Sequence, residues 1–320
     1  ATPASGHHPV RLGRVRPRTV LTAAAGTLAV HVLLTQLSSV NVLDALTSAR
    51  PDWLALALLG SALTYPGAAL TLLAFVPVAL PLSRTTLVQL ASSFLTLISP
   101  AGVGHLAMHF RYLQRSGLPA SVATTSIAGS QALTVAVTVV VLVVSSWLSG
   151  ASGSRLALLP SGHVLAVLAA AAVVLALGAA SPPGRRLVVR RVLPLTRTVV
   201  PQLVASASDP RRLSRAVLGV VLLHGGNVLA LEASLHAFST SLDLPTLVVV
   251  YLAAATIGSA APTPGGLGAV EAATVGGLTT SGVPLTPALT AVLAFRTATF
   301  WLPALLGWVA LTALQRRERV

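Results

Sequence analysis

The sequence predicts an all-α, polytopic integral membrane protein. Of its 320 residues, 54% are hydrophobic and 9% are charged, and the mean hydropathy is +0.84. Soluble domains carry about 25% charged residues, so the composition excludes a soluble domain of this length. Several apolar runs reach about 20 residues, which is long enough for a helix to cross the roughly 30 Å hydrocarbon layer of a bilayer.

The net charge of +14 comes from arginine alone, because the chain contains no lysine. The arginines gather in short clusters between apolar runs and form no basic face interleaved with aromatic residues. This pattern excludes nucleic acid as the expected partner and favours cytoplasmic loops that contact anionic lipid headgroups. The absence of cysteine excludes disulfides and thiolate metal sites. Met108 is the only methionine, so we expect the chain to be a segment of a longer protein.

Hydropathy and charge together predict about six full spans within one membrane domain, residues 19–315. The expected spans cover residues 19–37, 53–76, 119–148, 156–180, 216–238 and 285–314. We expect residues 1–18 to form a basic cytoplasmic lead-in or linker, and residues 316–320 to form a cytoplasmic tail. The most basic segment, 182–215, predicts a cytoplasmic loop.

Two further segments, 84–117 and 244–282, contain apolar runs that are too short to cross the membrane as single helices. The first is interrupted at Pro100, and the second at PTPGGLG, which starts at Pro262. Proline lacks the backbone donor that a helix needs, and glycine allows backbone angles closed to other residues, so both helices must break. Broken backbone at membrane depth is tolerated only inside protein or beside a watery cavity. We expect two re-entrant helical hairpins, and the alternative for the second is a loop outside the membrane.

These hairpins are predicted to form an inverted repeat. Their proline and glycine positions align at an offset of 164: Pro100, Gly102 and Gly104 with Pro264, Gly266 and Gly268. Gln131 falls opposite Arg296 at an offset one residue larger. Arginines flank the first hairpin, whereas none lies between Arg215 and Arg296, so charge places the two hairpins on opposite faces. In transporters built this way the substrate site lies near the bilayer midplane.

Glu271 and Arg296 are the strongest candidates for a functional role. Both are expected inside the membrane, where a charge facing lipid costs about 2.5 to 3.5 kcal/mol, so a buried ion pair is the arrangement that keeps both. Arg296 would hold a lipid phosphate through its planar fork. Glu271 would neutralise Arg296 in the empty state or bind a cationic headgroup. The alternative is a fixed ion pair that only closes the hairpin onto the last span.

Polar side chains elsewhere predict a cavity lining or interhelical hydrogen bonds. The span 216–238 carries His224, Asn227 and Glu232, but its two histidines are too far apart along one helix to share a metal ion. For His105 and His109, one turn apart, we expect interhelical bonding ahead of metal or proton binding. We predict no cofactor, no metal and no catalytic motif. The candidate substrate-binding or gating residues are Glu271, Arg296, Gly265, Gly266, Gly268, Pro264, Pro100, Gly102, Gly104, His105, Gln131, His224, Asn227 and Glu232.

The second hairpin and the last span also carry a resemblance to a known family. PTPGGLGAVEA from Pro262, then Phe295-Arg296 and the run from Thr299 to Pro303, resembles the signature of the lysylphosphatidylglycerol synthase transmembrane-domain family. This family is the flippase-like membrane part of bacterial multiple peptide resistance factors and their stand-alone relatives. The resemblance covers most of residues 20–315. Family members often have a glutamate and a Glu-Arg pair where this chain has His105 and Ser130-Gln131.

The resemblance implies a lipid translocase-like domain of the bacterial inner membrane that moves a phospholipid between leaflets. Aminoacylated phosphatidylglycerol or another lipid-linked headgroup would be the substrate, and membrane phospholipids the partners. No enzyme activity is expected of these 320 residues. The alternative is a non-transporting scaffold for an enzyme domain elsewhere in a longer chain, and a membrane-embedded transferase is a third hypothesis. The oligomeric state is left open.

Overall fold

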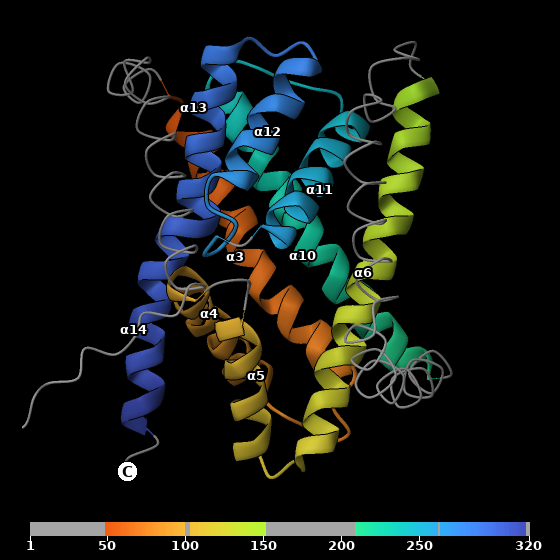
Figure 1. Ribbon diagram of the computed structural model, residues 1–320, viewed down its shortest axis with the longest axis vertical. Helices are drawn as coiled ribbons and strands as arrows, with labels where there is room; N and C mark the ends of the chain where they lie inside the picture. Colours follow the sequence, from red (N-terminus) through yellow and green to blue (C-terminus); the bar gives the residue numbers. More distant parts are fainter. Residues whose placement is uncertain (1–48, 100–102, 152–208, 262, 318–320) are drawn as a thin grey trace, which may run out of the picture.

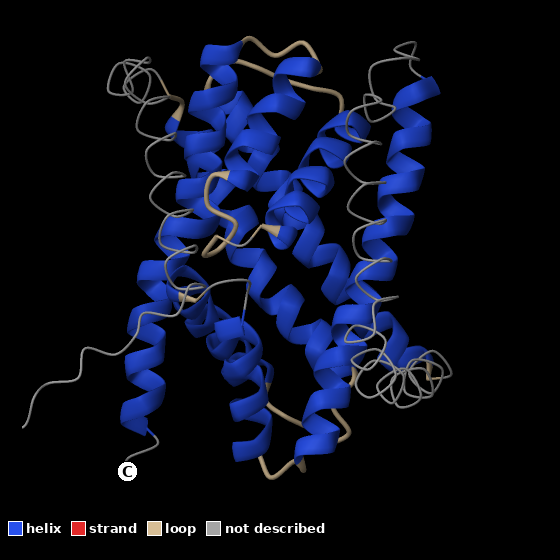
Figure 2. Cartoon of the chain, viewed as in Figure 1, coloured by secondary structure: helices blue, strands red, loops and turns tan. Residues whose placement is uncertain are grey.

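The computed structural model describes residues 49–99, 103–151, 209–261 and 263–317, and every regular element in these ranges is a helix (Figure 2). The expected spans 19–37 and 156–180 lie outside the described residues. So do the expected lead-in 1–18, most of the loop 182–215, and the candidate residues Pro100 and Gly102.

Four helical stretches are long and apolar enough to cross a membrane, and they coincide with four of the expected spans. They are α3 (Pro51–Ala74), α6 (Ala120–Ala151), α10 (Pro210–Ala237) and the stretch Leu285–Leu314. Helix α10 starts inside the expected loop 182–215 rather than at residue 216. The reason is local: Asp209 accepts hydrogen bonds from the backbone N–H groups of Arg211 and Arg212, and Pro210 occupies the first helical position.

The two interrupted segments each form a pair of short helices. The first pair is α4 (Leu82–Ile98) and α5 (Val103–Arg115), and the second is α11 (Leu244–Ala260) and α12 (Ala269–Thr280). In Figure 1 the first pair joins its neighbours α3 and α6 at the lower end of the molecule, whereas the second joins α10 and α13 at the upper end. The two pairs therefore enter the bundle from opposite ends.

The last stretch is one helical run with an irregular middle. It consists of α13 (Leu285–Arg296), the π-helical segment η2 (Thr297–Trp301) and α14 (Leu302–Arg317). The backbone N–H of Leu302 donates to the carbonyl of Thr297, five residues back. Pro303 follows directly and has no N–H to donate to the carbonyl of Thr299, four residues back. A proline at this place disfavours regular α-helical geometry in the preceding turn, and the wider π-helical turn lies there.

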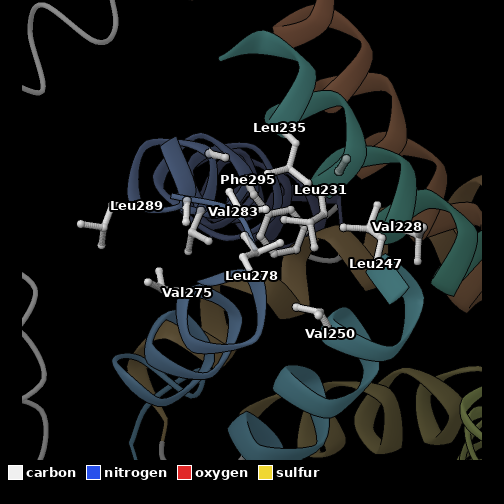
Figure 3. Close-up of a cluster of buried hydrophobic side chains, with 14 residues drawn as sticks. Val228, Leu231, Leu235, Leu247, Val250, Val275, Leu278, Val283, Leu289 and Phe295 are labelled. Carbon is white, nitrogen blue, oxygen red and sulfur yellow. The ribbon is translucent and has the colours of Figure 1, made fainter. Parts of the chain in front are cut away.

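A core cluster joins the second helix pair to the rest of the bundle (Figure 3). Buried apolar side chains from α10, α11, α12 and α13 meet there, among them Leu231, Leu247, Leu278 and Phe295. Large side chains elsewhere face outward instead, including Val139 and Trp147 on α6 and Leu305 on α14. Outward apolar faces around a packed interior are the arrangement expected for helices surrounded by lipid.

Helices α3 and α10 pack backbone to backbone. A Cβ on Gly226 would lie 2.5 Å from the carbonyl oxygen of Gly60, and a Cβ on Gly60 would lie 2.6 Å from that of Gly226. A second contact of this kind, about two helical turns further along, joins Gly67 to Gly219. Small residues that let two helices approach closely are the usual means of association in membranes, because lipid supplies no hydrophobic force between helices.

We predict that Gly226→Ala lowers the Tm of the purified chain in detergent, because the new methyl group forces the two backbones apart at a cost of about 1 to 3 kcal/mol. Gly225→Ala is the matched control, since a Cβ there meets nothing within 4 Å. An equal Tm for the two variants would show that α3 and α10 do not pack this closely.

Candidate functional site

The PTPGG turn between α11 and α12 has a backbone that only glycine can form without strain. Gly265, Gly266 and Gly268 have φ angles of +59°, +68° and +81°. A Cβ on Gly265 would strike the ring of Phe300, and one on Gly266 would lie 2.9 Å from the carbonyl oxygen of Gly258. Close packing as well as φ therefore requires glycine at these two positions.

Glu271 is held at both carboxylate oxygens. It occupies the first turn of α12, where Oε2 accepts a hydrogen bond of 2.7 Å from the backbone N–H of Gly268. Oε1 accepts one of 2.5 Å from Nε of Arg296. A carboxylate at a helix N-terminus is also favoured by the helix dipole. The residue is buried, with 5% of its surface exposed, so the two bonds replace the water that an exposed carboxylate would have.

Arg296, the last residue of α13, is buried beside Glu271 with 7% of its surface exposed. Besides the ion pair, Nη2 donates to the carbonyl of Gly265 at 3.4 Å, and the guanidinium carbon lies 4.2 Å from the centre of the Phe300 ring. A guanidinium has five N–H donors. Three of them, on the two terminal nitrogens, have no partner within the described residues.

Arg296 borders a cavity of about 490 Å³ inside the bundle. Both helix pairs contribute to the walls, together with α6, α10, α13 and η2. Of the candidate residues, those on the cavity wall are His105, Gln131, Asn227, Gly265, Gly266 and Arg296. Gln131 and Arg296, which align in the repeat, thus meet at one cavity. Its volume falls in the range of about 300 to 1,000 Å³ that is typical of ligand sites.

The other candidate residues that the structure describes do not line the cavity. Gly268 and Glu271 stand behind Arg296, and Pro264 belongs to the turn. Gly104 is the second residue of α5, and its N–H donates to Oγ of Ser99. His224 is hydrogen-bonded to Thr138 of α6 at 3.0 Å, an interhelical bond of the kind expected. Glu232 is half-buried on α10 and does not line the cavity.

A smaller chamber of about 130 Å³, with both polar and apolar residues on its wall, shares His105, Leu106 and Gln131 with the cavity. His105 is hydrogen-bonded to Ser92 of α4 at 2.9 Å, so it ties the first helix pair together as expected. The ring of His109 meets that of His105 edge-on at 4.1 Å between centroids. Sequence reasoning missed Gln89 and Thr263 at these walls. Gln89 is a glutamine within the otherwise mostly apolar first half of the first helix pair, and that pattern could have indicated a cavity-lining position.

Apolar helices, two oppositely entering helix pairs and a buried arginine at a central polar cavity define a helical membrane protein with an internal polar site. The family description "Lysylphosphatidylglycerol synthase TM region" matches residues 19–307, and the chain therefore belongs to that family. No curated protein matches the chain. In the described ranges, no three His, Asp or Glu side chains lie close enough together to hold a metal ion.

We predict that Glu271→Gln lowers the Tm of the chain strongly, because it leaves Arg296 buried without a counter-charge, a loss of about 3 to 5 kcal/mol. The double variant Glu271→Gln/Arg296→Gln should unfold at a higher temperature than Glu271→Gln alone, because both charges are then gone.

The exposed pair of Arg50 and Asp52, whose side chains are both 59% exposed, supplies the control. Asp52→Asn should change the stability by no more than about 1 kcal/mol. Additive losses in the double variant would mean that Glu271 and Arg296 are not coupled.

Proposed function

We propose that this chain is a lipid translocase-like domain that moves a phospholipid between the leaflets of the bacterial inner membrane. The observation that supports it most is Arg296, which lines a cavity bounded by both helix pairs and has three N–H donors without a partner among the described residues. A phosphate group is the natural ligand of such a planar fork, because two of its oxygens can accept parallel hydrogen bonds.

Glu271 has a positioning role in this proposal. Its bond to Nε of Arg296 leaves both terminal nitrogens outside the ion pair, and its bond to Gly268 holds the carboxylate on the turn. The ring of Phe300 supports the guanidinium on one face. The arginine is thus fixed before the lipid arrives, so little side-chain entropy is lost when the phosphate binds.

The proposed fold for this activity has six spans and two re-entrant hairpins inserted from opposite membrane faces. Support comes from the two helix pairs, which join their neighbours at opposite ends of the molecule (Figure 1). Movement of one pair against the other would open the cavity toward each leaflet in turn, as in other transporters with broken helices. The π-helical segment beside Arg296 is a suitable place for such a helix to bend. No ATP-driven or enzymatic step forms part of the proposal.

The direct test is leaflet exchange of labelled phosphatidylglycerol in liposomes that contain the purified chain. We predict exchange by the wild-type chain, and a decrease of at least about tenfold with Arg296→Gln, because a charged hydrogen-bond partner of the phosphate is lost.

Arg111→Gln, at an exposed arginine of α5 away from the cavity, is the matched control and should retain exchange. No exchange by a folded wild-type chain would contradict the proposal. Equal exchange by wild type and Arg296→Gln would remove Arg296 from it.

One observation favours a scaffold role as the second candidate. Among the described residues, the first helix pair and α6 contribute Thr96, His105, Leu106 and Gln131 to the cavity wall, with no acid and no arginine. The one buried carboxylate beside this wall, Glu271, is already paired. A scaffold would bind an enzyme partner with Arg296→Gln as well as without it, and would exchange no lipid.

A further inference from the structure

The polar groups around the cavity specify which headgroup the phosphate should carry. Resting on the proposed function, we infer that the bound lipid has an uncharged, hydroxyl-rich headgroup, such as glycerol or a sugar, and not a cationic one. Three features of the site support this: the acids that are missing from it, the uncharged groups that are present, and their position relative to Arg296.

A cationic headgroup is best bound by a carboxylate, and none lines the cavity among the residues that the structure describes. The chain has only seven acidic residues, of which Asp44 and Glu318 lie outside the described ranges. Asp52 pairs with exposed Arg50, and Asp209 and Asp243 cap helices α10 and α11. Glu232 does not line the cavity or the chamber.

Glu271 is the remaining acid, and both of its oxygens are already bonded. An ammonium group there would share the single negative charge of Glu271 with Arg296 and place two positive charges in one poorly solvated site. Like charges at short range in such surroundings cost several kcal/mol. An aminoacyl or ethanolamine headgroup is therefore disfavoured by the charge arrangement.

The polar side chains on the described chamber wall include no acid and no arginine, and apolar residues make up the rest of the wall. These polar side chains are Thr71, Gln89, His105, His109, Ser130, Gln131 and Thr134. The amides of Gln89, which is buried, and of Gln131, which is exposed, make no hydrogen bond within the described residues. The Nε2 atom of His109, a residue with 3% of its surface exposed, is buried and has no partner in the described part of the chain. A buried polar atom left unpaired is costly, so the retention of His109 here indicates a ligand or ordered water.

Hydroxyl groups suit this set better than a charged group does. Amides both donate and accept, as hydroxyls do, so a polyol can satisfy several of them at once. The chamber volume of about 130 Å³ corresponds to about four water molecules, at about 30 Å³ each. That is room for the few hydroxyl-bearing carbons of a glycerol or for part of a sugar ring.

The arrangement of the two compartments matches a phosphodiester. Arg296 borders the larger cavity, and the chamber shares His105, Leu106 and Gln131 with that cavity. A lipid whose phosphate lies on Arg296 would therefore direct its headgroup past Gln131 into the chamber. The buried oxygen of Thr263, which has no partner in the described part of the chain, adds one more hydroxyl on the Arg296 side.

Binding of short-chain lipids to the purified chain tests the inference separately from transport. We expect phosphatidylglycerol to bind about tenfold more tightly than lysyl-phosphatidylglycerol and phosphatidylethanolamine. Gln131→Leu should weaken the binding of phosphatidylglycerol by about tenfold. It should leave the binding of phosphatidic acid unchanged, because this lipid has the phosphate without the polyol. Gln131→Glu should shift the preference toward the lysyl lipid.

Gln114→Leu, at an exposed glutamine of α5 outside the site, is the matched control and should bind all lipids like wild type. Equal or tighter binding of the lysyl lipid would overturn the inference. So would unchanged phosphatidylglycerol binding in Gln131→Leu, which would indicate that the chamber holds only water. Selective binding without leaflet exchange would contradict the proposed translocase and leave the headgroup assignment standing. If no lipid binds, both fail.

Discussion

The buried ion pair between Glu271 and Arg296 is the interaction on which the centre of this protein depends. A lone charge of either sign would be unstable among these apolar helices, so each residue makes the other tolerable. The pair also joins two elements that are distant in sequence, the start of α12 and the end of α13. Because Glu271 contacts Nε and not the terminal nitrogens, the arginine remains able to bind a second anion.

The broken helices provide the space in which this pair can act. Where α11 ends and α12 begins, backbone groups that a continuous helix would satisfy internally are free to bond to side chains, and Gly265 and Gly268 do so with Arg296 and Glu271. The turn, the ion pair and the cavity wall are therefore one local structure. The first helix pair repeats the design with uncharged residues, which makes the two sides of the cavity chemically different.

Proline, glycine and charge made much of this predictable from the sequence. The breaks at Pro262 to Gly268 and around Pro100 bound the short helices because these residues restrict the backbone directly, and Glu271 and Arg296 pair because few other charges lie so deep. Side-chain direction was harder to predict. Glu232 turns away from the cavity and Gln89 toward the chamber, since helix rotation depends on packing with neighbours such as α3 and not on local sequence.

A high-resolution structure of the chain in nanodiscs of phosphatidylglycerol would test the central claim most directly. The account predicts a lipid phosphate on the terminal nitrogens of Arg296, with Glu271 still bonded to Nε and the headgroup directed past Gln131. Lipid phosphates found only on the outer surface of the bundle, with the terminal nitrogens of Arg296 bonded to protein, would contradict it.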